Sequence, residues 1–141
     1  MQLTEKVELP SDSSDHRWYA LRNLVFSKRL DEAKQLIVER PSLLTETNSC
    51  GETALHFLAV ENDLQGVAWL HEKGQSVDSI DAFGEPVIFA VAKLRYRELF
   101  EWFVNAGADI TVCDADGLNL LAHLREWDVD DMADWISEKF K

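Results

Sequence analysis

The sequence has 141 residues, of which 46% are hydrophobic and 28% charged, which fits one globular domain with its own core. Its formal net charge of −12 argues against binding to nucleic acid or to anionic membranes, both of which attract Lys and Arg. No apolar run reaches the roughly 18 residues that a membrane helix needs. Residues 1–10 also lack the apolar segment of a secretory signal.

The first segment, residues 1–17, is expected to be a flexible leader. It contains Ser11, Ser13 and Ser14 beside the acidic Asp12 and Asp15, a composition that is typical of exposed chain. Regularly spaced apolar residues follow it, so we expect the folded domain to span residues 18–141.

Most of this domain repeats itself with a period of 33 residues. Gly51, Gly84 and Gly117 share this step. Five more series share it: Trp69, Trp102 and Trp135; Gly74 and Gly107; Asn48, Asp81 and Asp114; Leu55, Ile88 and Leu121; and Leu70, Phe103 and Ile136. A fixed period of this length indicates stacked repeats, in which each unit buries its apolar face against its neighbours.

A more divergent unit precedes these three. Its leucines match those of the next unit with a step of 34, so one extra residue is expected near Pro41. The matched residues are Leu21, Leu24, Leu30 and Leu36 with Leu55, Leu58, Leu64 and Leu70. The sequence therefore predicts four repeats, at about residues 18–50, 51–83, 84–116 and 117–141.

Each unit is predicted to contain two short helices and an extended loop. In the second unit, Thr53 is a suitable N-cap for a helix that ends near Glu61. A second helix then runs from about Leu64 to Lys73, where Gly74 ends it in a left-handed conformation. The predicted fold is therefore an all-α solenoid of four stacked helix-turn-helix units with short extended loops.

Two motifs resemble the ankyrin repeat. Gly51-Glu52-Thr53-Ala54-Leu55-His56 resembles the family's opening Gly-x-Thr-Pro-Leu-His, and Gly107-Ala108-Asp109-Ile110-Thr111 resembles its Gly-Ala-Asp-Val-Asn loop. The third and fourth units depart from the opening, with Pro86-Val87-Ile88-Phe89 and Asn119-Leu120-Leu121-Ala122. The resemblance covers about residues 18–141. It implies an ankyrin solenoid that binds other proteins, and a structural role for His56 in tying loops together.

The residues do not suggest an enzyme. Cys113 and His123 are close in sequence, but no Asn or Asp is evident to orient them as a catalytic pair. The acidic residues Asp128, Asp130, Asp131 and Asp134 lack the central Gly and the final Glu of a calcium loop. No glycine-rich phosphate motif occurs. We therefore expect no catalytic residue, no metal site and no cofactor.

The two cysteines, Cys50 and Cys113, are too few and too far apart in sequence for a disulfide framework. Free thiols are typical of a reducing compartment, so the sequence predicts a cytoplasmic protein.

Charge is unevenly distributed along the chain. Residues 18–50 carry a net charge of +1, whereas residues 51–141 carry −11. A partner protein with a basic surface would be attracted to the acidic part. The alternative is that these carboxylates only keep the protein soluble.

The resemblance also implies where a partner binds, because ankyrin proteins use the loop tips and the exposed side of the first helices. The matching tip residues are Ser49, Cys50, Glu52, Ala82, Phe83, Glu85, Ala115, Asp116 and Leu118, and the matching helix residues are Phe26, Ser27, Val60, Glu61, Lys93, Leu94, Glu126 and Trp127. Aromatic and carboxylate groups together suit a protein interface. Alternatively, Phe83, Leu94 and Trp127 pack inward in a diverged repeat.

The leading hypothesis is a non-catalytic module that binds a basic partner protein, and a sharper version of it is an immunity- or antitoxin-like protein. The alternative is a regulatory or scaffold adaptor in a larger assembly, and a small metal- or cofactor-dependent enzyme is a distant third. The three phased Trp are expected to pack in one row, with Trp102 among the most buried.

Overall fold

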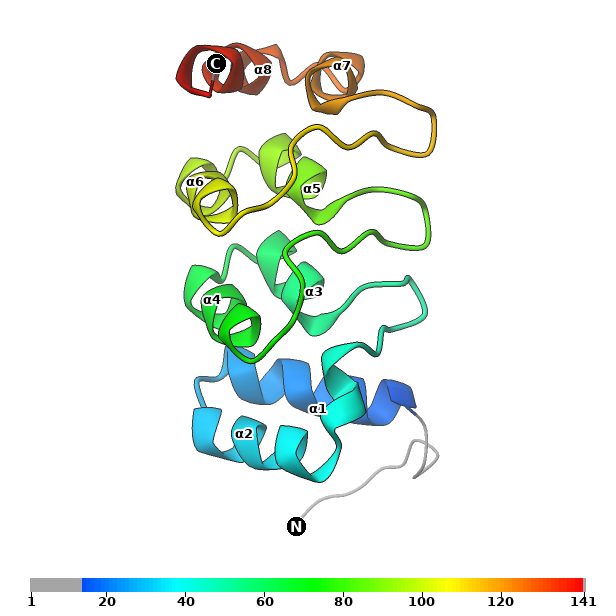
Figure 1. Cartoon of the computed structure of the whole chain (residues 1–141), viewed down its shortest axis with the longest axis vertical. Coiled ribbons are helices and arrows are strands. Elements are labelled where there is room, and N and C mark those ends of the chain that lie inside the picture. Colours follow the sequence, from blue (N-terminus) through cyan, green and yellow to red (C-terminus); the bar gives the residue numbers. More distant parts are fainter. Residues whose placement is uncertain (1–13, 141) are drawn as a thin grey trace.

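A computed structural model describes residues 14–140 of the chain, and over this range it contains eight α-helices and one short 3-10 helix (Figure 1). The elements are α1 (Ser14–Phe26), α2 (Leu30–Glu39), η1 (Pro41–Leu44), α3 (Ala54–Val60), α4 (Leu64–Glu72), α5 (Val87–Lys93), α6 (Arg97–Asn105), α7 (Leu120–Glu126) and α8 (Asp130–Lys139). The only β-pairing in this range consists of two isolated bridges, Ile80 with Pro86 and Cys113 with Asn119. The expected all-α solenoid is confirmed.

The helices form four antiparallel pairs that stack along one axis (Figure 1). The first helices of the pairs, α1, α3, α5 and α7, contact one another in succession, and each also contacts the second helix of its own pair. The loops that join consecutive pairs project beyond the first helices, on the side opposite the second helices (Figure 1). Loop tips and first helices therefore share one side of the stack.

The beginning of the chain differs from the expectation. Helix α1 begins at Ser14, so residues 14–17, which were assigned to the flexible leader, are helical. The rest of that leader lies outside the described residues. The loop near Pro41, where the extra residue of the first repeat was expected, contains η1.

Short polar contacts determine where the helices begin and end. Thr53 Oγ1 accepts a hydrogen bond from the backbone N–H of His56 at 3.1 Å, as the N-cap assignment predicts. Asn119 does the same for α7, accepting from the N–H of Ala122 at 2.9 Å. Gly74, with φ of +116°, follows α4 in the left-handed region, which residues with a side chain rarely adopt.

The loop tips are built alike. Asp81 Oδ1 accepts hydrogen bonds from the backbone N–H groups of Phe83 and Glu85, both at 2.9 Å. Asn48 and Asp114 hold their own loops with the same pair of contacts. The phased Asn or Asp side chain thus accepts the hydrogen bonds of the backbone N–H groups in the turn. The side chains at the loop tip are therefore not needed for these contacts and can face solvent.

The core continues through all four repeats, and its largest fully buried side chains include Trp18, Phe89, Phe100 and Phe103. The phased Trp row lies at the edge of this core. Trp102 is only half-buried, and its ring lies edge-to-face against that of His71, with the ring centroids 5.6 Å apart. Among the five Trp, Trp18 in the divergent first repeat is the fully buried one, whereas Trp102 is half-buried like Trp69 and Trp135.

No helix within residues 14–140 is both long enough and apolar enough to cross a bilayer.

Candidate functional site

The structure leaves every one of the predicted partner-binding residues at least partly accessible. Nine are exposed: Ser49, Cys50, Glu61, Ala82, Phe83, Leu94, Asp116, Glu126 and Trp127. Five are half-buried: Glu52, Val60, Glu85, Lys93 and Leu118. The alternative that the large apolar members pack inward is wrong, because Phe83 is 75% exposed, Trp127 59% and Leu94 44%.

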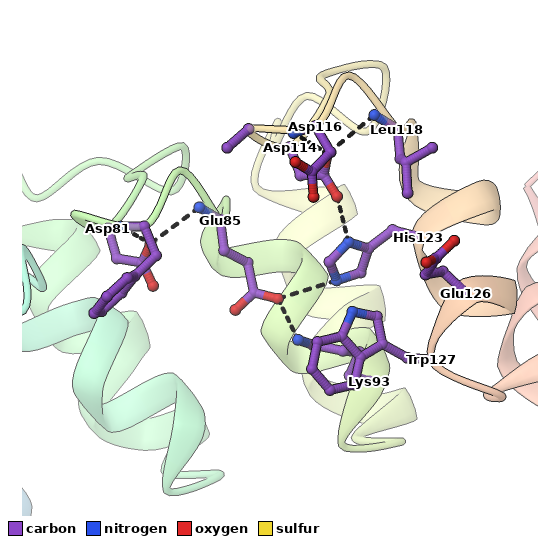
Figure 2. Close-up of a pocket in the computed structure, with 11 residues that line it drawn as sticks. Asp81, Glu85, Lys93, Asp114, Asp116, Leu118, His123, Glu126 and Trp127 are labelled. Atoms are coloured by element: carbon purple, nitrogen blue, oxygen red, sulfur yellow. Dashed lines mark hydrogen bonds and ion pairs between the residues drawn. The ribbon is translucent and has the colours of Figure 1, made fainter.

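Half of these residues line one hollow of about 580 Å³ between the third and fourth repeats, here called the α5–α7 hollow (Figure 2). They are Phe83, Glu85, Lys93, Asp116, Leu118, Glu126 and Trp127. Ala115 lines it as well, and so do three residues that the site prediction did not include, Asp81, Asp114 and His123. The remaining predicted residues lie outside this hollow.

His123 connects the two repeats at the base of this site. Its Nδ1 lies 2.6 Å from Asp114 Oδ2, and its Nε2 lies 3.1 Å from Glu85 Oε2 (Figure 2). An ionised carboxylate can only accept a hydrogen bond, so the doubly protonated ring satisfies both contacts, whereas the neutral ring satisfies only one. With His123 only 5% exposed, these contacts form a buried clamp between α7 and the loop before α5.

The clamp also corrects the view that His123 has no acidic partner to orient it. Asp114 was singled out only as a phased loop residue, and its carboxylate performs two tasks. One oxygen closes the turn, while the other accepts from His123. These contacts lower the pKa of Asp114, with the hydrogen bond from His123 as the largest cause and the backbone N–H of Leu118 as the next.

Lys93 joins the same cluster from the C-terminal end of α5. Its Nζ lies 2.5 Å from Glu85 Oε2 and 4.2 Å from the centroid of the Trp127 ring. The carboxylate of Glu85 therefore binds both His123 and Lys93, and Lys93 in turn lies against the indole (Figure 2). These contacts position Trp127 by a cation–π interaction while leaving more than half of it exposed.

Both ring nitrogens of His123 face carboxylates, and Cys113 is exposed. Among the residues that the structure describes, no group of three or more His, Cys, Asp or Glu side chains could hold a metal ion. The hollow is concave and lined by aromatic side chains and carboxylates, which are groups that commonly take part in binding.

His56 has the structural surroundings that the resemblance implied. It is 1% exposed, and its Nδ1 lies 3.3 Å from Ser79 Oγ in the following loop. Burial lowers the pKa of His56, since a desolvated ring favours the neutral form.

A smaller hollow of about 290 Å³ lies on the first helices at the other end of the stack. It contains Glu61 together with Arg22, Phe26 and Phe57. The guanidinium carbon of Arg22 lies 4.8 Å from the centroid of the Phe57 ring. A cation thus lies against an aromatic ring at both ends of this side of the molecule, Arg22 against the half-buried Phe57 and Lys93 against the exposed Trp127.

Comparison with known proteins agrees with the fold. The family model described as Ankyrin repeat matches residues 50–82. A putative ankyrin repeat protein of Rickettsia bellii (strain RML369-C) is 28% identical over 101 residues, which covers 69% of this chain and 56% of that relative. The match therefore spans little more than half the length of the curated relative. The stacked helix pairs, the repeat match and this relative all agree with an ankyrin-type solenoid, to which the chain is similar.

Proposed function

We propose that this chain is a non-catalytic module that binds a partner protein with a basic surface, through the side formed by its loop tips and first helices. Ankyrin repeats generally mediate protein–protein interactions. The observation that carries the proposal for this chain is the α5–α7 hollow, where the exposed aromatic side chains Phe83 and Trp127 lie beside carboxylates.

Exposed aromatic groups of this size support a binding role because they leave apolar area in contact with water. Burying such groups in a complex returns about 25 cal/mol for each Å² removed from water. Large aromatic residues in the centre of an interface also account for much of the energy that holds complexes together. Trp127 is already positioned by Lys93, so little side-chain freedom would be lost on binding.

The sign of the charge supports the choice of a basic partner. Residues 51–141, which form the second to fourth repeats, carry a net charge of −11. A field of one sign over an extended surface accelerates the encounter with an oppositely charged protein. A sharper form of the proposal is an immunity- or antitoxin-like inhibitor, which would form a tight pair with one basic protein. The two cysteines of this chain, Cys50 and Cys113, are free, and free thiols are typical of a reducing compartment, which supports a cytoplasmic location.

The test compares two matched pairs of charge reversals in capture of the partner from the native host. Asp116→Lys with Glu126→Lys reverses two exposed carboxylates of the hollow, and Glu72→Lys with Glu98→Lys reverses two on the second helices. Glu85 is unsuitable because its carboxylate is paired with Lys93 and His123.

The proposal requires the hollow pair to release the captured protein and the second-helix pair to retain it. Each variant should keep the helical circular dichroism of the wild type, since none of the four carboxylates is buried. Loss of the partner only with the second-helix pair would contradict the proposed binding face.

A further inference from the structure

We propose that the α5–α7 hollow binds an arginine side chain of the partner, with the guanidinium against Trp127 and the carboxylates of Asp116 and Glu126. This inference rests on the proposed function, because the arginine would belong to the segment of the partner that docks on the loop tips.

The hollow already holds one cation of its own. Lys93 Nζ lies 2.5 Å from Glu85 and 4.2 Å from the Trp127 ring centroid, the combination of carboxylate and aromatic face that stabilises a cation. Lys93 occupies only the inner part of the site, since Trp127 remains 59% exposed. Phe83, at 75% exposure, adds a second aromatic side chain from the preceding loop tip.

The carboxylates around the hollow outnumber the cations that neutralise them. Five line it: Asp81, Glu85, Asp114, Asp116 and Glu126. Glu85 and Asp114 are paired internally with Lys93 and His123. Within residues 14–140, Asp116 and Glu126 have no ion-pair partner, so two negative charges at the mouth of the hollow remain available to a bound cation.

A guanidinium fits this arrangement better than an ammonium does. Asp116 comes from the loop tip before α7 and Glu126 from the last turn of α7, so their carboxylates approach the hollow from two directions (Figure 2). A guanidinium is flat, stacks on an indole and has five N–H donors that can reach two carboxylates at once. A lysine ammonium is a strongly hydrated point charge, and Lys93 already supplies one to the hollow.

The test is an NMR titration of the ¹⁵N-labelled full chain with three capped amino acids. Nα-acetyl-arginine amide is the probe, Nα-acetyl-citrulline amide is its uncharged analogue, and Nα-acetyl-lysine amide tests the preference for a guanidinium. The indole N–H signal of Trp127, assigned by its loss in Trp127→Phe, reports binding at the hollow. The arginine probe should shift this signal saturably, the lysine probe should bind more weakly, and the citrulline probe should leave it unchanged.

Two variants locate the charge that matters. Asp116→Asn with Glu126→Gln should weaken arginine binding by roughly fivefold, as the loss of two solvent-exposed ion pairs implies. Glu72→Gln with Glu98→Gln, on the second helices, should leave the affinity unchanged. The spectra themselves show whether each variant remains folded.

The inference is overturned if citrulline amide shifts Trp127 as strongly as the arginine probe, or if lysine amide binds at least as tightly. It is also overturned if the second-helix pair weakens binding as much as the hollow pair, or if the largest shifts lie outside the hollow. Partner capture that depends on the hollow while the arginine probe fails would refute only this inference. Partner capture that ignores the hollow would refute the proposed function instead.

Discussion

Replacing Trp18 and Trp102 by Ala, one at a time, compares two indoles that the structure places in different surroundings. Trp18 is fully buried, with edge-to-face contacts to Tyr19 at 4.8 Å and Phe57 at 5.7 Å. Trp102 is half-buried on the outer side of α6.

The burial of each ring sets the size of the expected effect. A tryptophan removes about 200 Å² from water when it is fully buried, which corresponds to roughly 5 kcal/mol at 25 cal/mol for each Å². The indole N–H of Trp18 has no hydrogen-bond partner among the described residues, and burying such a group costs about 1–3 kcal/mol. We therefore expect Trp18→Ala to lower the free energy of unfolding by about 2–4 kcal/mol, close to the usual range for large-to-small core changes. Trp102→Ala should lower it by less, because part of its side chain is already in contact with water.

Urea unfolding followed by far-ultraviolet circular dichroism measures both changes. Because neighbouring repeats can unfold separately, the m-value must stay constant before the two free energies are compared. Equal losses for the two variants, or a loss below about 1 kcal/mol for Trp18→Ala, would refute the packing described here.

Three further predictions concern the loops and the charges. Gly84→Ala should destabilise the protein more than Gly107→Ala. Both residues have positive φ, but only a Cβ at Gly84 would meet another residue, the Cβ of Ala115 at 2.6 Å. The midpoints of urea unfolding measure the difference, and equal losses of stability would contradict the contact between the loop tips. The lowered pKa of Asp114 contributes stability above the unfolded carboxyl pKa of about 4, and this contribution is lost as pH falls through the folded value. Asp114→Asn should therefore reduce the loss of stability below about pH 4 in acid titrations, and an unchanged loss would contradict this role of Asp114. Finally, the rate of association with the captured partner should fall as the salt concentration rises from about 0.05 to 0.5 M, because salt screens the attraction between opposite charges. Association rates measured by stopped flow that do not depend on salt would argue against a basic partner.

The fold was largely predictable because the same capping and turn residues recur in several repeats and therefore support one another. Thr53, Gly74 and the phased Asn and Asp residues each specify a cap or a turn through contacts a few residues away, and the structure contains those contacts. The first repeat was harder because it matches the others only through its leucines. The burial of Trp18, for example, depends on how that unit packs against Phe57 of the second repeat.

The site was predictable in outline but not in chemistry. Family resemblance suggested positions that could contact a partner, and the structure leaves two of them, Phe83 and Trp127, exposed. The clamp of His123 between Asp114 and Glu85 could not be predicted from local patterns. The three residues lie at separate places in the sequence, and His123 and Glu85 are 38 residues apart. One feature of the repeat could have indicated the clamp. Position 123 corresponds to the apolar residues Phe57 and Ala90 in the preceding units, and a histidine at such a position requires hydrogen-bond partners.

Amide hydrogen exchange of the chain, measured alone and with its captured partner, tests the proposed binding face most directly. Slowed exchange should appear in loop-tip residues 82–85 and 115–118 and in α7, which surround the α5–α7 hollow. Backbone amides that become covered by a partner are protected, while those on the opposite side keep their rates. Protection confined to the second helices α4, α6 and α8, with the loop tips unchanged, would contradict the account.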